Sequence, residues 1–270
     1  MQLDIINLIL NPPPELIDAF FSYLVGLILV VIIVLLSKWQ GIGVEDKLLI
    51  GTIRGTIQII LMALVLEIIF ELKDMVLIFG LLTIMSIFAA HTAASNLDEI
   101  PGVMKATLPG ITIGSLFVMF LCVILGIVEP VGEYIIPMGG MVIGNSMGLS
   151  SLALERMWSN AQKQRDLLET ALALGASAYQ ALDLTIKESV KAGLLPNLNR
   201  YAALGIVTIP GLMSGMIIGG MLPVVAALYQ VIVFPMIFLG SIINALISSR
   251  IFLGQMFNDR LQIMVPPLGE

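Results

Sequence analysis

Eight polar side chains interrupt or end long apolar runs, where a hydrocarbon environment makes charged and amide groups costly. They are Arg54, Gln58, His91, Asn96, Asn145, Ser146, Glu155 and Asn244. Such groups persist in a membrane when they face protein or water, so we predict that they line an internal transport path. Arg54 and Gln58 lie four residues apart and share one helix face. The alternative for this pair is structural, with Arg54 reaching the membrane interface or pairing with a carboxylate.

Metal ligands are few in this sequence. His91 is the single histidine and could bind a metal, but a lone histidine at a helix end is more often an ordinary polar residue. Cys122 is the single cysteine and fits a packing role in its apolar run. The sixteen methionines suit either a path for soft ions such as Cu(I) or flexible apolar packing. Any metal ligands therefore stay unknown from the sequence.

Several motifs of catalysis and nucleotide binding are absent from the sequence. It contains no G-x-x-x-x-G-K-S/T phosphate loop, no H-E-x-x-H and no G-x-S-x-G. We therefore expect a protein that is not an enzyme and that holds no cofactor of its own. Energy for transport would come from a partner subunit or from an ion gradient.

The composition indicates an integral membrane protein. Hydrophobic residues make up 58% of the 270 residues and charged residues 12%, with a mean hydropathy of +1.03. The net charge of -6 argues against a nucleic-acid partner. We predict an all-α polytopic membrane protein in which residues 1–270 form a single transmembrane domain.

Apolar runs of about 20 residues predict about seven transmembrane helices. They cover residues 17–36, 48–70, 75–95, 108–128, 134–154, 202–221 and 224–249. The short break at residues 219–223, which contains two glycines and a proline, predicts that the last two helices form a tight antiparallel pair.

The basic residues predict the orientation in the membrane. With seven spans, eleven of the thirteen fall on one side: Lys38, Lys47, Lys105, Arg156, Lys163, Arg165, Lys187, Lys191, Arg200, Arg250 and Arg260. Lys73 falls on the other side, and Arg54 lies within a span. The positive-inside rule then places the C-terminus and the long loop at about 156–200 in the cytoplasm. The N-terminus is expected on the outer side of the cell (inner) membrane.

Glycines recur every four residues in four of the predicted spans, which allows close approach of helix backbones. The series are Gly51 and Gly55; Gly110 and Gly114; Gly140, Gly144 and Gly148; and Gly211, Gly215 and Gly219. These faces pack either within one chain or against a second copy in a homodimer.

The long loop is rich in helix-forming residues, and Gly175 divides it into two helical pieces. Leu167, Ala171 and Leu174 share one face of the first piece, and Glu169 lies at its charged edge. A second apolar stripe consists of Leu182, Ile186 and Val190. A short helix with an apolar stripe and charged flanks is suited to a groove on a partner protein.

The loop also resembles a known one. The pattern Glu169-x-Ala171-x-x-x-Gly175-Ala176-Ser177 is similar to the EAA-type loop of ABC permeases, whose cytoplasmic helix docks on the ATPase subunit. Over its whole length the chain resembles the FetB family of iron-export ABC permeases, in residues 137–146, 171–177, 192–199, 205–215 and 227–230, with Pro223, Arg54 and Gln58. The spacing from Gly175 to Leu194-Leu195-Pro196 is longer than in the importer loop.

The resemblance implies a permease subunit that exports metal, chiefly iron, as a homodimer in the lipid bilayer. It also implies a separate ABC ATPase subunit, which would bind the ATP and magnesium. Two alternatives stay open: an ABC permease for a non-metal substrate such as a lipid or a sugar nucleotide, and a stand-alone channel or gradient-driven carrier. A carrier would place charged ligands at mid-membrane, whereas Glu67 and Glu155 lie towards the ends of spans.

Overall fold

The computed structural model describes residues 13–258 and 262–266. Arg260 and the first twelve residues, which the predicted topology also uses, lie outside the described residues. The chain divides into two compact units, residues 1–68 and residues 69–270. The described part is helical throughout, apart from two isolated bridges. The predicted all-helical polytopic fold is confirmed.

The first unit is a helical hairpin. Helix α2 covers Pro14–Gln40 and helix α3 covers Glu45–Leu72, whose last residues belong to the second unit. The left-handed backbone of Gly41 (φ 65°) ends α2 and starts the turn. The hydroxyls of Tyr23 and Thr56 are hydrogen bonded at 2.8 Å, and the Ser37 hydroxyl donates to the Glu45 carboxylate at 2.8 Å. Most of the apolar side chains of this hairpin are exposed, as lipid-facing side chains would be.

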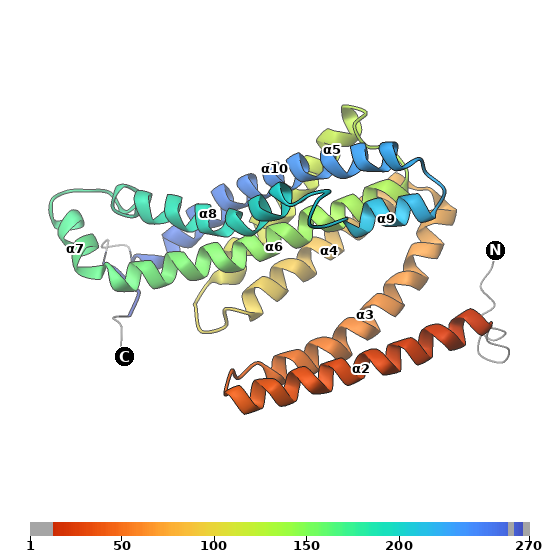
Figure 1. Cartoon of the computed structure of the whole chain (residues 1–270). Helices are drawn as coiled ribbons and strands as arrows, with labels where there is room; N and C mark the ends of the chain where they lie inside the picture. The colour runs from red at the N-terminus through yellow and green to blue at the C-terminus, as the bar shows by residue number, and fades with distance from the viewer. Residues whose placement is uncertain (1–12, 259–261, 267–270) are drawn as a thin grey trace. The chain divides into compact units, whose positions relative to one another are not determined.

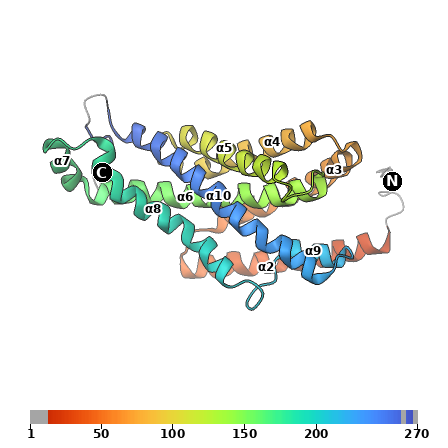
Figure 2. The same ribbon diagram turned by 90° about the horizontal axis from the view of Figure 1, so that it is seen from above.

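The second unit contains four membrane-length helices, α4, α5, α6 and α10, which lie side by side in one bundle (Figures 1 and 2). Its helices are α4 (Met75–Ser95), α5 (Val103–Ile124), α6 (Gly132–Lys163), α7 (Arg165–Ala173), α8 (Ala178–Ala202), α9 (Gly211–Ile218) and α10 (Pro223–Met256). Helix α5 packs on α4 and α10, and α6 packs on α4, α8 and α10. Helix α9 packs on α10.

Contacts along these helices fix their relative directions. Tyr134 near the start of α6 contacts Tyr229 near the start of α10, with ring centroids 5.2 Å apart. Trp158 near the end of α6 contacts Phe252 near the end of α10, with centroids 6.2 Å apart. Helices α6 and α10 are therefore parallel. The Thr185 hydroxyl of α8 bonds to Gln164 just beyond α6, so α8 runs antiparallel to both.

The two ends of the second unit differ in their number of basic residues, which is the quantity that the positive-inside rule counts. We call the end where α6 and α10 finish the basic end, because it carries Lys105, Arg156, Lys163, Arg165, Lys187 and Arg250. The opposite end, where α6 and α10 start, carries Lys73 with Asp74, Glu129 and Glu133, and we call it the acidic end. This asymmetry agrees with the grouping of basic residues in the sequence.

The structure corrects the predicted span at 202–221. Six described helices are long and apolar enough to cross a membrane: α2, α3, α4, α5, α6 and α10. Residues 202–221 are not one helix, because α8 ends at Ala202, a turn follows at residues 203–210, and α9 has only eight residues. Gly205 takes a left-handed conformation (φ 79°) and Pro210 precedes α9, so the helical hydrogen-bond ladder is interrupted.

Helices α6 and α10 are longer than predicted. Helix α6 has 32 residues and continues to Lys163, well past the predicted end at residue 154. Helix α10 has 34 residues and ends at Met256 rather than at residue 249. The region 156–200 is helical as predicted, and it comprises the end of α6, all of α7 and most of α8.

Candidate transport path and coupling helix

A buried asparagine joins the helices at the centre of the second unit. The Asn244 side-chain amide on α10 donates to the Ser146 carbonyl and to the Ser150 hydroxyl of α6, both at 2.9 Å. The Ser248 hydroxyl lies 2.9 Å from the Asn244 amide oxygen and 3.0 Å from the Ala106 carbonyl of α5. An amide in an apolar bundle needs such partners, since an unpaired buried polar group costs about 1–3 kcal/mol. Asn244 therefore fixes the register of α5, α6 and α10.

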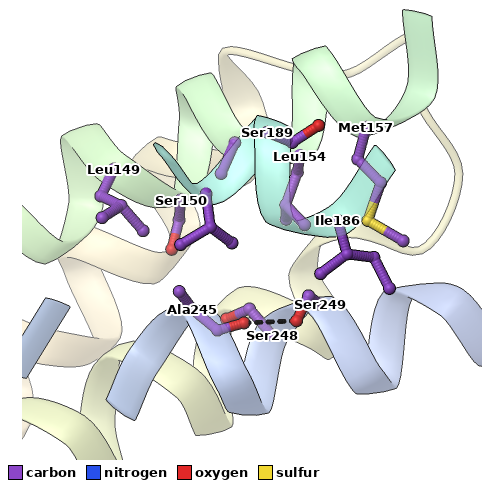
Figure 3. A pocket seen from close by; sticks show the side chains of 11 residues that line it. Leu149, Ser150, Leu154, Met157, Ile186, Ser189, Ala245, Ser248 and Ser249 are labelled. Carbon is purple, nitrogen blue, oxygen red and sulfur yellow. Dashed lines mark hydrogen bonds between the residues drawn. The ribbon is translucent and has the colours of Figure 1, made fainter. Parts of the chain in front are cut away.

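A small serine-lined cavity separates α8 from α6 and α10 (Figure 3). Its volume of about 10 Å³ is close to the minimum for one water molecule. Four serines line it, namely Ser150, Ser189, Ser248 and Ser249. The Ser189 hydroxyl on α8 is buried and has no hydrogen-bond partner among the described residues. The contact of α8 with α6 and α10 is therefore formed here by small polar side chains. Larger apolar side chains would fill this space more completely.

Arg200 and Asn145 meet on the surface of the second unit. The Arg200 guanidinium on α8 donates to the Asn145 side-chain oxygen at 3.2 Å, and the Asn145 amide donates to the Met141 carbonyl at 2.7 Å. Arg200 is exposed and Asn145 is half-buried. A guanidinium has five N–H donors, so Arg200 can bind a further acceptor.

Arg200 lies near the middle of the bundle. Asn145 is 13 residues from Gly132 at the start of α6, which corresponds to about 20 Å of helix. Tyr201, next to Arg200, stacks on Phe234, which is 11 residues from the start of α10 and thus about 17 Å along it. Helices α6 and α10 have 32 and 34 residues, so Arg200 lies nearer to the middle of the bundle than to either end.

The broken helix segment begins beside this arginine. Within the second unit, α8 starts at the basic end and reaches Arg200 at mid-depth. The turn at residues 203–210 and then α9 lead to the start of α10 at the acidic end. Non-helical backbone at membrane depth is tolerated where it is buried in protein or lines a water-filled cavity, and in transporters it commonly borders the substrate.

Within the second unit, the other predicted path residues do not gather at this point. Arg54 and Gln58 belong to the first unit, where both are exposed. His91 and Asn96 lie at the end of α4 and are exposed. Ser146 is fully buried next to Asn145, whereas Glu155 is half-buried and faces Arg156 at 3.8 Å. Among the described residues, no group of three His, Cys, Asp or Glu side chains could hold a metal ion.

Helix α7 exposes two leucines at the basic end. Leu167 is 66% exposed and Leu174 is 84% exposed, while Ala171 is half-buried. On the other face Leu168 is 2% exposed and packs in the core. The predicted stripe is therefore an unpartnered apolar face within the second unit.

Charged and capping groups hold α7 in place. The Arg165 guanidinium pairs with Glu169 at 2.9 Å and also donates to the Val265 carbonyl at 3.0 Å. Gly175 takes a left-handed conformation (φ 94°) that ends this segment, and half-buried Ala176 follows it. The Ser177 hydroxyl then accepts from the Gln180 backbone in a capping box that starts α8.

The second apolar stripe faces inward. Leu182 and Ile186 are buried and Val190 is half-buried, and all three pack in the core cluster with α6 and α10. The stripe on α8 is therefore not available to a partner protein. A helical period shows which residues share a face but not what that face contacts.

Three functional candidates were missed by the sequence reasoning. Arg200 was counted as a cytoplasmic charge, and its pairing with Asn145 depends on α8 folding back along α6. Ser189 carried no signal in the sequence. Gln230 of α10 is buried, and neither its amide nitrogen nor its amide oxygen has a partner among the described residues. A glutamine within an apolar run was the signal that could have identified it.

The family model described as "Uncharacterised protein family (UPF0014)" matches residues 20–257. The "Probable iron export permease protein FetB" of Escherichia coli K12 is 28% identical over 249 residues, which cover 92% of this chain and 96% of the relative. The "UPF0014 membrane protein STAR2" of Oryza sativa is 29% identical and covers 90% and 87% of the two chains. The "Protein ALUMINUM SENSITIVE 3" of Arabidopsis thaliana is 28% identical and covers 88% and 87%.

No solved structure matches the chain significantly. The family match covers most of the chain, and similarity to the FetB protein extends over nearly the full length of both. The resemblance seen in the sequence is thereby confirmed, and this multi-pass membrane protein belongs to the UPF0014 family.

Proposed function

We propose that this chain is the permease subunit of an ABC transporter and exports a metal, with iron as the first candidate. The main support for this proposal is α7, a short helix at the basic end. Its two leucines, Leu167 and Leu174 at its C-cap, are exposed and have no partner within the second unit. An apolar helix face of this kind is suited to a groove on a separate ATPase subunit. That subunit binds ATP and magnesium and supplies the energy.

Helix α8 connects the proposed docking site with the proposed path. It extends from Ala178, close to α7, to Ala202, two residues beyond Arg200, with Pro196 inside it. A displacement of α7 by the ATPase is therefore carried along α8 towards mid-membrane. Pro196 lacks a backbone N–H donor, so α8 can bend between its two ends.

The cargo assignment follows from the relative that is named a probable iron export permease. The described residues of one chain contain no cluster of typical ligands for a bare metal ion. We propose that iron crosses either as a complex with a small chelator or with ligands from two copies of the chain. A cargo without metal is the alternative within the same transporter class.

The charge asymmetry supports a cytoplasmic basic end, and hence a cytoplasmic C-terminal end of α10 in the cell (inner) membrane. An N-terminus on the outer side, as the distribution of basic residues in the sequence predicts, is part of the proposal.

A homodimer is part of the proposal. Gly144 and Gly148 on α6 are exposed, and an added Cβ at either would meet no atom within 4 Å. In contrast, Gly110 and Gly114 are packed inside the second unit. The open glycines on α6 therefore allow close approach of another membrane helix, for which we propose a second copy of the chain.

Purification of the chain together with its ATPase tests the proposal directly. We expect a complex of two permease and two ATPase subunits, whose ATP hydrolysis is stimulated by the cargo in liposomes. An iron salt, an iron–citrate complex and citrate alone serve as probes. Transport by the purified chain alone, driven by an ion gradient and without any ATPase, would contradict the proposal and favour a carrier.

A gradient-driven carrier remains the second candidate because of Arg200. Carriers commonly place charged groups at mid-membrane, and Arg200 lies there beside a helix break. The carrier model leaves the exposed leucines of α7 without a role. For that reason the ABC permease is the better-supported function.

Arg200→Gln is expected to lower transport by about tenfold or more, because a hydrogen bond from a charged group contributes roughly 1.5–3 kcal/mol. The amount of assembled complex should stay unchanged, since Arg200 is exposed and its partner Asn145 is also bonded to the Met141 carbonyl. Arg200→Lys should retain part of the activity. Lys163→Gln, which removes one exposed charge at the basic end, is the matched control. Normal transport by Arg200→Gln would remove this residue from the path.

A further inference from the structure

An open groove runs between α8 and α10 at the basic end of the second unit. Its volume is about 340 Å³. Its lining includes Lys187, Lys191, Leu194 and Leu198 from α8, with Ile242 and Leu246 from α10. It lies on the outer side of the α8–α10 pair, because Leu198 and Leu246 are about half-exposed.

The α8 wall of the groove changes from polar to apolar along its length. Asp183, Lys187 and Lys191 are spaced four residues apart, and Leu194 and Leu198 continue the same face. Lys187 pairs with Asp183 at 2.6 Å. This pairing raises the pKa of Lys187, so the ammonium stays charged at neutral pH. Lys191 is exposed and adds a second positive charge.

The α10 wall shows the same change at the same level. Ile242 and Leu246 line its inner part, and Ser249 lines its outer part. Arg250 follows Ser249, and its guanidinium lies 5.9 Å from the ring centre of Tyr179 at the start of α8. Since α8 and α10 are antiparallel, both helices present apolar residues towards mid-membrane and basic residues towards the basic end.

The polar part of the groove lies at the depth of a lipid headgroup. Gly193 packs on Leu149, where an added Cβ would be 3.2 Å from the leucine side chain. Leu149 is 17 residues from the start of α6, or about 26 Å along it, which is near the inner edge of a 30 Å hydrocarbon core. Lys191 is two residues further out, so its long side chain reaches the interface.

We propose that this groove binds an anionic phospholipid, with the acyl chain along Leu194, Leu198, Ile242 and Leu246 and the headgroup phosphate beside Lys191, with Lys187 one helical turn further out. The lining supplies two cationic groups, Lys187 and Lys191, against the single carboxylate of Asp183, which is paired with Lys187. Basic pockets between transmembrane helices at the cytoplasmic side are suited to anionic headgroups. The proposal does not depend on the cargo or on the ATPase.

A photo-crosslinking amino acid in place of Leu246 tests which molecule occupies the groove. In native membranes we expect adducts with the mass of a phospholipid, enriched in phosphatidylglycerol or another anionic lipid over the bulk composition. An adduct with a second copy of the chain, or with residues 13–68 of the same chain, would overturn the proposal. So would lipid adducts that show no preference for an anionic headgroup.

The double variant Lys187→Gln with Lys191→Gln should weaken the preference for phosphatidylglycerol over phosphatidylcholine on the order of 20-fold, because each basic group near the interface contributes about fivefold. Native mass spectrometry of the purified chain in detergent measures this ratio. Lys163→Gln should leave it unchanged. Inorganic phosphate should not displace the lipid, and displacement at millimolar phosphate would show that the groove is a site for free anions.

Discussion

Leu174→Asp is expected to separate the permease from its ATPase while the helical bundle stays folded. Leu174 is 84% exposed, so the folded chain loses no packing when it is changed. In the complex a buried anchor residue contributes about 2 kcal/mol or more, and a buried carboxylate adds a desolvation cost. We therefore expect assembly to weaken by roughly 30-fold or more. Co-purification of the ATPase at a fixed concentration measures the loss.

Leu184→Asp is the matched control for this change. Leu184 lies on α8 at the same end and is 67% exposed, but it is outside the α7 stripe. Leu167→Asp should behave as Leu174→Asp does, because both leucines belong to the proposed docking face. If both α7 variants retain full assembly and full stimulation of ATP hydrolysis, α7 is not the coupling helix.

Gly114→Ala is expected to destabilise the second unit by about 1–3 kcal/mol, as overpacking of a core does. An added Cβ would lie 2.8 Å from the Gly240 carbonyl and 3.0 Å from the Asn244 backbone nitrogen. Both are backbone atoms, so α5 and α10 must move apart, which also disturbs the Asn244 network. Gly114→Leu should prevent correct folding altogether.

Gly80→Ala on α4 is the control, because its Cβ would meet no atom within 4 Å. Alanine has the higher helix propensity, so this variant should be neutral or slightly stabilising. Thermal unfolding of the two variants in detergent, followed by circular dichroism, gives the comparison. Equal unfolding temperatures for Gly114→Ala and the unchanged chain would show that the α5–α10 contact is looser than described.

Much of the fold follows from the sequence alone. The runs of apolar residues identify six of the helices, because a helix must be about 20 residues long to cross a hydrocarbon core and must satisfy its own backbone. The helix formers around Gly175 predict α7, the turn and α8, since these preferences are local. The ordered motifs likewise identify the family.

Other features were decided by the tertiary structure. The predicted span at 202–221 was wrong because its apolar composition hides the break at Gly205 and Pro210. The stripes on α7 and α8 look alike in sequence, yet Leu174 is exposed and Leu182 is buried, since burial depends on which neighbour covers each face. The glycine series look alike as well, but Gly114 is packed and Gly144 is open.

The candidate path also combines features that the sequence predicts with features that only the tertiary structure decides. The sequence identified Asn145 and Asn244 as polar groups within apolar runs, which needs only composition. It could not pair Asn145 with Arg200, because the two residues are 55 positions apart and meet only when α8 folds back along α6. Polarity is a property of each residue, whereas depth and partners follow from long-range packing.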